Sequence, residues 1–490
     1  MEKTKKFKII LLIFISIFLI FYFLIFKTNL FKFATSLISY ENKTIIKKYF
    51  FPYQYNSQLE DLIKMLNDQI ENEIKYSSRI NEELQESNKL LSNIPNILGQ
   101  STLNLISKKD INFDNTNYEL NIFKNDYVRV KKASDAKSGS SYIDKYKNDI
   151  IYVTADGYFQ YFSKNFLGNK DIKSKSINSN IKNIILYSEF YEDSKYGIKD
   201  LYIYRDNIFI SFIRKINKNC YNTSILKAKF DYEFLNFEPF FFPEECIQST
   251  IPSFHPHSSG GRMYANNDNM YFSTGEYLDR SKAQSMNSVF GKILKLNLNE
   301  TNIKNYEIMS LGHRNVQGLY FDETNNFIIS TEHGPQGGDE VNINFNLNKK
   351  DKPNFGWPIS SYGEHYNFKE RDDSSQAYKL APLYKSHERY GFVEPLMYFT
   401  PSIAISQITK IPTINSEKNE DIFIFGSLGK DPEEGDMSLH FIKFDKKNKK
   451  ITKHNFFPVD NRVRDITSLD NDTILLTLET NGTIGILKKK

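Results

Sequence analysis

The sequence predicts an all-β fold, a six-bladed β-propeller, preceded by a transmembrane helix and a helical stalk. A strand–turn–strand pattern recurs six times after about residue 120, and the N-terminus holds an apolar run followed by a heptad pattern. The 490 residues contain 64 Lys and Arg against 59 Asp and Glu. This near balance of charge argues against a nucleic acid as the main partner.

Residues 1–28 are expected to form a membrane anchor. An uncharged apolar run from Ile9 to Phe26 precedes Lys27, and about 18 helical residues cross the hydrocarbon core. A cleaved signal peptide would have a shorter run and a small-residue cleavage site, so an uncleaved anchor is preferred. The lysines before the run place the N-terminus in the cytoplasm. The rest of the chain is then expected on the periplasmic, outer face of the cytoplasmic membrane.

Residues 29–57 are expected to be a linker and residues 58–95 a helical stalk. A heptad pattern from Leu59 to Ile94 places apolar residues at eight of eleven core positions, and Pro95 ends it. Two interpretations stay open. The stalk is either a coiled coil, which would make the protein a homo-oligomer on the membrane, or a single amphipathic helix packed on the main domain.

Residues 120–490 are predicted to form the propeller. Short runs of β-branched and aromatic residues meet at turns such as Asp206–Asn207, Asn267–Asp268 and Asn471–Asp472, which is typical of hairpins. Six such units recur, and a four-stranded propeller blade takes about 50 residues. A β-sandwich gives no reason for six repeats. The loop-rich residues 349–400 are expected to cover one face.

Two cysteines, Cys220 and Cys246, lie in the part expected to be exported. The oxidising compartment would allow one disulfide between them, and two unpaired buried thiols are the alternative.

Polar residues concentrate in four segments, which are GHRNVQG at 312–318, EHGPQGGDEVN at 332–342, NFGWP at 354–358 and NRVRD at 461–465. Arg314, Arg462 and Arg464 are predicted in loops or at strand ends, where a propeller gathers residues around its central channel. Guanidinium groups gathered there would repel one another unless an anion lay between them. The alternative is that they form plain salt bridges with nearby acids, namely Asp465, Glu340 or Asp339.

These ordered segments resemble the soluble glucose dehydrogenases that depend on pyrroloquinoline quinone (PQQ), and their aldose and sorbosone dehydrogenase relatives. The resemblance covers roughly residues 120–490. In the first two blades, however, only the general pattern of short apolar runs and turn residues matches. It implies a membrane-anchored dehydrogenase that oxidises an aldose or related sugar alcohol by hydride transfer to PQQ. Electrons would then pass to an unidentified respiratory acceptor. A non-enzymatic propeller that binds a glycan or protein partner is the alternative.

The resemblance also implies roles for individual residues. Calcium would act as Lewis acid on the quinone, on the carbonyls of Gly334 and Pro335, with Asp339 and Glu340 resembling carboxylates of a second, structural calcium site. The implied residues for PQQ are Arg314, Asn315, Lys430, Arg462 and Arg464.

The implied general base is His257, with His255 as the fallback, because histidine titrates in the right range to take a hydroxyl proton. The chain departs from the glucose dehydrogenase pattern at several positions. The spacing from His257 to Arg262 is one residue longer, and Lys430 stands one residue later. Glu276 and Tyr277 stand where the family has Asp and Gln, and Thr400 stands where the glucose enzymes have Trp. The sequence therefore leaves the substrate open between glucose, a broader range of aldoses and another alcohol.

Overall fold

The chain divides into two compact units, Met1–Asn96 and Ile97–Lys490. The computed structural model describes residues 13–18, 20, 52–92, 100–125, 131–133, 136–138, 140–155, 157–185, 197–217, 219–251, 253–366, 368, 370–412 and 419–490. Most of the predicted anchor (1–28) and linker (29–57) lies outside these residues. Among the helices within them, none is both long and apolar enough to cross a membrane.

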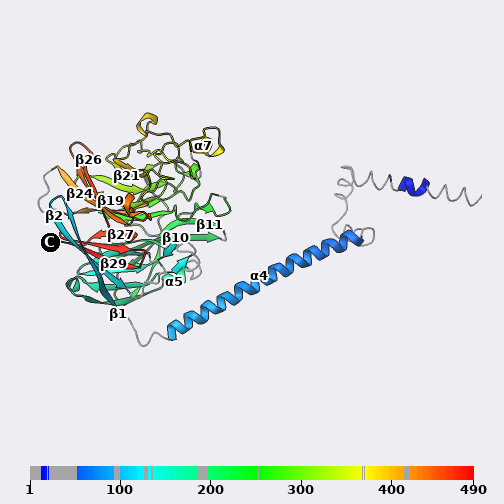
Figure 1. Cartoon of the computed structure of the whole chain (residues 1–490), viewed down its shortest axis with the longest axis horizontal. Coiled ribbons are helices and arrows are strands. Elements are labelled where there is room, and N and C mark those ends of the chain that lie inside the picture. Colours follow the sequence, from blue (N-terminus) through cyan, green and yellow to red (C-terminus); the bar gives the residue numbers. More distant parts are fainter. Residues whose placement is uncertain are drawn as a thin grey trace, which may run out of the picture. The chain divides into compact units, whose positions relative to one another are not determined.

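The first unit contains helix α4 (Pro52–Ser92), drawn in blue in Figure 1, which spans nearly all of the predicted stalk and begins six residues before it. Its heptad residues Leu59, Ile63, Leu66, Ile70 and Ile80 are between 43% and 55% exposed. An apolar stripe of this kind needs a partner surface, so the coiled coil stays a prediction.

The second unit is all-β, as predicted, and is built from antiparallel blades whose first strands contact one another in a closed ring. The ring runs in the order β5 (Ser141–Tyr146), β9 (Ile198–Tyr204), β15 (Gly260–Asn266), β19 (Val316–Asp322), β23 (Ile405–Ile411) and β27 (Val463–Ser468), and returns to β5. We call these the inner strands. This closed ring is the arrangement of a β-propeller.

Each inner strand is followed by the outer strands of its own blade. In chain order these are β6 (Asp149–Thr154), β7 (Phe159–Ser163) and β8 (Asp171–Ser179); β10 (Asn207–Asn217), β11 (Cys220–Lys229) and β13 (Glu238–Phe241); β16 (Asn269–Thr274), β17 (Lys292–Asn297) and β18 (Glu307–Leu311); β20 (Phe327–Glu332), β21 (Asp339–Asn344) and β22 (Met397–Phe399); β24 (Glu420–Ser427), β25 (Ser438–Asp445) and β26 (Lys450–Pro458); and β28 (Thr473–Leu478) and β29 (Thr483–Lys489).

The last blade is completed from the N-terminal side of the unit. Strand β2 (Thr116–Asn125) pairs with β29, and β1 (Gln100–Phe113) pairs with both β2 and β8, which joins the first and last blades. The propeller unit therefore begins before residue 120, the predicted boundary. The charged sequence Lys108-Lys109-Asp110 interrupts the apolar alternation of β1, so the sequence pattern did not reveal this strand.

Short elements complete the described part of this unit. They are β3 (Lys131–Ala133), β4 (Ala136–Ser138), β12 (Phe234–Leu235), β14 (Ile247–Gln248), α5 (Ile181–Ile184), α7 (Gln376–Leu380) and the 3-10 turns η1 (Lys164–Phe166), η2 (Arg280–Lys282), η3 (Glu388–Tyr390) and η4 (Pro432–Glu434).

The inner strands are edge strands, because no strand pairs with their channel-facing edges. The N–H groups on these edges would be left unpaired without other acceptors. Side chains of neighbouring blades accept several of these hydrogen bonds. Asp144 Oδ2 accepts from Ile203 N at 2.6 Å, and Asp200 Oδ2 accepts from Met263 N at 2.8 Å. Gln407 Oε1 accepts from Leu319 N and Asp465 Oδ2 accepts from Ile143 N, each at 2.9 Å. Polar residues on the inner strands thus hold one blade to the next.

Arg262 on β15 lies at the centre of this network and is 1% exposed. Its Nη1 donates to Asp200 at 2.9 Å and to Asp465 at 2.8 Å. Its Nε donates to the Gln317 carbonyl and its Nη2 to the Arg464 carbonyl, each at 2.7 Å. One side chain therefore joins β9, β15, β19 and β27.

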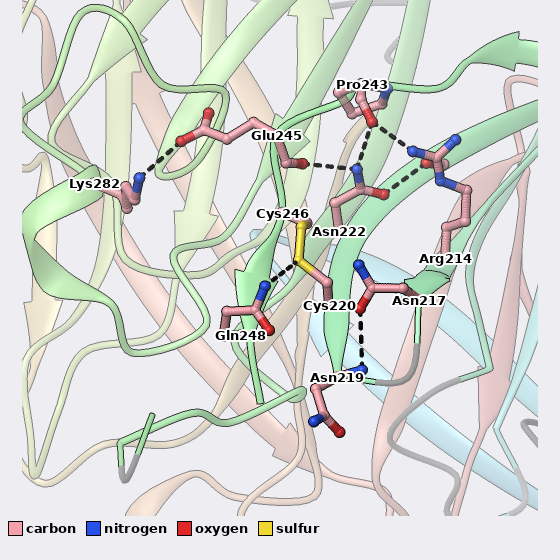
Figure 2. Close-up of a disulfide and its surroundings, with 11 residues drawn as sticks. Arg214, Asn217, Asn219, Cys220, Asn222, Pro243, Glu245, Cys246, Gln248 and Lys282 are labelled. Carbon is pink, nitrogen blue, oxygen red and sulfur yellow. Dashed lines mark hydrogen bonds and ion pairs between the residues drawn. A yellow bond between two sulfur atoms is a disulfide. The ribbon is translucent and has the colours of Figure 1, made fainter. Parts of the chain in front are cut away.

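Cys220 and Cys246 form a disulfide (Figure 2). It fixes the segment after β13 against β11, and Asn222 Nδ2 donates to the Pro243 and Glu245 carbonyls of that segment. The Glu245 carboxylate accepts from Lys282 Nζ at 3.0 Å and from Val289 N at 2.8 Å. The crosslink thus also supports the loop after β16 in the next blade.

Candidate active site

The residues singled out from the sequence lie at one end of the channel, where the inner strands begin. Arg314 and Asn315 directly precede β19, and Arg462 directly precedes β27. Gly334 and Lys430 follow β20 and β24, which run antiparallel to β19 and β23 and so end at the same edge. Strand topology alone brings these segments together.

Arg462 and Arg464 share one carboxylate, that of Glu479. Arg464 Nε donates to Glu479 Oε2 at 2.6 Å, and Arg462 Nε lies 3.4 Å from Glu479 Oε1. Burial opposes ionisation of Glu479, but the charges of Arg464 and Arg462 outweigh it and keep the pKa of its carboxyl below the usual value. Two guanidinium charges and one carboxylate leave a net positive charge.

Arg314 has no carboxylate within salt-bridge distance among the described residues. Its Nη1 donates to the His333 carbonyl at 3.1 Å, and its buried Nε has no hydrogen-bond partner there. Its guanidinium carbon lies 5.4 Å from the centre of the Trp357 ring, within range of a cation–π contact.

The charges of all three arginines act on one buried side chain, that of His333. Burial lowers the pKa of His333 to about 3, and the charges of Arg314, Arg464 and Arg462 all lower it further. The imidazole is therefore neutral, and its Nε2 lies 2.7 Å from the Ile405 carbonyl. The three guanidinium groups are not paired with Asp465, Glu340 or Asp339; Asp465 instead binds Arg262.

Glu276, which the sequence marked only as a departure from the family pattern, is fully buried near Arg314. Burial raises the pKa of its carboxyl to about 7, although Arg314 and Arg280 oppose this shift. Its carboxylate oxygens meet no donor at good geometry, while the Trp357 side chain lies near enough to favour the charged form. A carboxyl that titrates near neutral pH can accept or donate a proton.

Backbone hydrogen bonds bring the His257 loop to the same place. Tyr277 N donates to the Ser258 carbonyl at 2.9 Å, and Glu276 N donates to the Arg314 carbonyl at 3.1 Å. His257 is exposed, and its ring centre lies 4.9 Å from that of His255. The loop can approach this closely because Gly260 has a φ of +64°, and a Cβ there would lie 2.7 Å from Gly275 N.

Asn315 and Lys430 occupy different environments. The buried Asn315 Oδ1 accepts from Gly260 N at 3.1 Å and from Gln317 Nε2 at 2.9 Å, which ties the His257 loop to β19. Lys430 is exposed, in a loop whose Leu428 carbonyl accepts a hydrogen bond from Arg462 Nη1. This loop therefore borders the arginine cluster.

The structure does not bring the carboxylates of Asp339 and Glu340 together. Asp339 accepts from Gly334 N at 2.9 Å and from Ile405 N at 3.1 Å. Glu340 lies 3.2 Å from His387 Nε2. The two acids are successive residues of β21, so they point to opposite faces. In the described part of the chain, no three His, Cys, Asp or Glu side chains are arranged to hold a metal ion.

Burial, rather than ligand contact, accounts for one departure from the family pattern. Tyr277 is fully buried, and its hydroxyl lies 2.6 Å from Thr223 Oγ1. This residue therefore supports the core beneath the site and does not present its hydroxyl to a substrate. Thr400, in contrast, is exposed.

Comparisons with known proteins show which proteins this chain is similar to. A family model described as glucose/sorbosone dehydrogenase matches residues 174–487. The aldose sugar dehydrogenase of Escherichia coli K12 is 28% identical over 242 residues, which cover 46% of this chain and 58% of that protein. Quinoprotein glucose dehydrogenase B of Acinetobacter calcoaceticus is 28% identical over 156 residues, which cover 26% of this chain and 30% of that protein. The chain thus spans about half the length of the first relative and less of the second.

A solved structure shares the fold. A crystal structure of a glucose dehydrogenase superposes with a TM-score of 0.55 at 19% identity, and the match covers 72% of this chain and 98% of that chain.

We predict that Glu479→Gln lowers the free energy of unfolding by about 3 kcal/mol at pH 7, because it leaves two largely buried arginines without their carboxylate. The pKa of Glu479 is lowered in the folded protein, so its contribution is present above the usual glutamate pKa and is lost as pH falls below it. Urea unfolding at pH 7 and near pH 3 measures this, with the exposed Glu433→Gln as control. An equal loss at both pH values would contradict the prediction.

Proposed function

The chain belongs to the glucose/sorbosone dehydrogenase family, and from this premise we propose that it oxidises an aldose or related sugar alcohol with PQQ as hydride acceptor. The observation that carries the proposal is the uncompensated charge at the channel mouth. Arg462 and Arg464 share a single carboxylate, and Arg314 has a buried Nε–H without a partner among the described residues. A tricarboxylate quinone would supply the missing acceptors.

The residues of the chain fit such an anion. Arg314, Arg462 and Arg464 would bind its carboxylates, Lys430 would add a charge at the rim, and Asn315 would hold the neighbouring loop. Bound there, the quinone would take the hydride from the carbon that carries the substrate hydroxyl. The name of the Acinetobacter relative, a quinoprotein, supports this cofactor.

His257 would take the hydroxyl proton, since it is exposed on a loop that backbone hydrogen bonds hold beside Glu276 and Arg314. Glu276, whose pKa burial raises to about 7, could pass this proton on or stabilise the imidazolium. The sugar gives up two electrons with the hydride and one proton to the base, and the carbon that carried the hydroxyl becomes a carbonyl carbon. A respiratory acceptor would then reoxidise the quinone.

Calcium would be held by the carbonyls of Gly334 and Pro335, where it would polarise the quinone as Lewis acid. The carboxylates of Asp339 and Glu340 do not fit a shared ion, because each is engaged on its own face of β21. This departure also favours the second candidate function, a non-enzymatic propeller that binds a glycan or protein partner.

The outer face of the cytoplasmic membrane is the proposed location, with residues 1–28 as anchor and α4 as a coiled-coil stalk between copies. The disulfide supports an oxidising compartment, and the exposed apolar heptad residues of α4 support self-association.

We predict that Arg464→Gln weakens PQQ binding about 30-fold, because a charge-assisted hydrogen bond contributes about 2 kcal/mol. Absorbance titration of the full chain with PQQ and calcium measures the affinity, and the exposed Arg389→Gln serves as matched control. Failure of the unmodified chain to bind PQQ would favour the non-enzymatic propeller.

We predict that His257→Asn lowers kcat for dye reduction with aldoses by about 100-fold or more, the usual effect of removing a general base. His255→Asn, the neighbouring histidine, should change kcat less than about twofold. Steady-state assays of the PQQ-loaded chain measure both variants. A loss confined to His255→Asn would move the base to that residue.

We predict that Leu66→Lys with Ile70→Lys converts an oligomer into a monomer, because two charges would enter an apolar seam. Sedimentation of the detergent-solubilised chain measures its mass, and Asp68→Lys on the outer helix face is the control.

Removal of residues 1–28 should release the protein from membranes but keep it oligomeric. A monomeric unmodified chain, or a deletion variant that stays on membranes, would contradict this.

A further inference from the structure

A second cavity opens at the other end of the channel, where the inner strands end. Its volume is about 770 Å³, and residues near the ends of all six inner strands line it. This volume lies within the range of small-molecule sites. None of the residues assigned above to the candidate active site lines it.

The walls continue the row of side chains that links the blades. Four lining residues each lie two positions after a residue of the same strand that hydrogen-bonds to a neighbouring blade. The pairs are Asp200 and Tyr202, Arg262 and Tyr264, Gln407 and Thr409, and Asp465 and Thr467. Alternate residues of a strand share a face, so the chain that builds the network also builds the cavity. Asp144 and Tyr320 complete the ring from β5 and β19.

Three tyrosines form one side of the cavity. The ring centres of Tyr202 and Tyr264 are 5.8 Å apart, and those of Tyr264 and Tyr320 are 5.1 Å apart. Such a wall offers both apolar ring surface and hydroxyl groups, a combination that suits a ligand with C–H faces and hydroxyl edges.

Two of the three lysines that line the cavity are already engaged. Lys410 Nζ lies 2.9 Å from Asp322 and 3.0 Å from Asp421. Lys145 Nζ donates to the Ser468 and Leu469 carbonyls at 2.7 and 2.9 Å. These ammonium groups would repel a cationic ligand, and their existing partners reduce their attraction for an anion.

Three further charged residues of the lining are exposed and lie in turns. Lys147 Nζ lies 4.7 Å from the centre of the Tyr146 ring, Arg205 Nη1 lies 3.5 Å from Asp268, and Asp206 accepts from the Tyr146 hydroxyl at 2.8 Å.

Apart from these exposed residues, the groups that remain available are mostly uncharged. The hydroxyls of Thr409 and Thr467 have no hydrogen-bond partner within the described ranges, and neither does the exposed Glu323 carboxylate. Burial raises the pKa of Asp144 to about 7, so its carboxyl is only partly ionised at neutral pH. The cavity therefore suits a neutral ligand rich in hydroxyl groups.

We infer that this cavity is a second ligand site and that it binds a neutral saccharide of one or two rings. The inference does not depend on the proposed dehydrogenase function, because the two sets of residues are disjoint. It places a ligand site at the end of the channel opposite the candidate active site.

Calorimetric titration of the full, detergent-solubilised chain with glucose, maltose and cellobiose, without quinone, tests the inference. We expect saturable binding of one of these sugars, at one per chain. Tyr320→Phe with Thr409→Val should weaken it about tenfold through the loss of two hydroxyl groups. Thr467→Val alone, at a half-buried position, provides a second reading if the double variant does not fold. Dye reduction by the PQQ-loaded chain should be unchanged in these variants.

The Arg464→Gln variant separates this site from the candidate active site, and it should keep the sugar binding. Three results would overturn the inference: no binding of any of the sugars, an affinity that cavity variants leave unchanged, or binding that Arg464→Gln abolishes. Binding of tetramethylammonium or citrate in place of the sugars would overturn the chemical class.

Discussion

The described propeller depends on one buried cation at its axis. Six inner strands meet around a channel, and their channel-facing edges carry no neighbouring strand. Arg262, on β15, donates hydrogen bonds to three of the other five inner strands, through Asp200, Asp465 and two backbone carbonyls. A single guanidinium faces two carboxyl groups, and burial raises the pKa of both. The arrangement is costly to desolvate and stays favourable only while every donor and acceptor has its partner. It therefore fixes the relative position of the blades more sharply than apolar packing alone would.

The network of Arg262, Asp200 and Asp465, which we call the hub, also supports the candidate active site. The two carbonyls that accept from Arg262 belong to Gln317 and Arg464. The Gln317 side chain donates to Asn315 and accepts from Arg464, while Arg464 in turn binds Glu479. The position of the cationic cluster is thus set from below by the network that closes the ring. The arginine cluster has fewer carboxylates than guanidinium groups, so its members repel one another. Its backbone nevertheless stays in place because Arg262 binds the Gln317 and Arg464 carbonyls.

The repeated hairpins, the order of the motifs and the gathering of arginines at strand starts could be predicted from sequence, because all three follow from strand alternation and turn residues. Glu479 could also have been found. The hairpin around Asn471–Asp472, extended outward, pairs Val463 with Leu478, which puts Glu479 beside Arg462. The hub could not be predicted from sequence. Arg262 is 62 residues from Asp200 and 203 residues from Asp465, and only closure of the ring brings the three side chains together. The raised pKa of Glu276 depends on burial, which no local pattern reports.

The two ends of the channel differ for a structural reason. At the candidate active site the functional groups come from loops before the inner strands and after the neighbouring strands, such as the His257 and Lys430 loops, so their length can vary without disturbing the sheet. At the opposite cavity four lining residues come from the strands themselves, two residues beyond the hub, so their spacing is fixed by the pleat. A loop insertion of one residue, as between His257 and Arg262, can therefore change the chemistry at one end and leave the other untouched. The hub between them lets a single fold carry two sites that change independently.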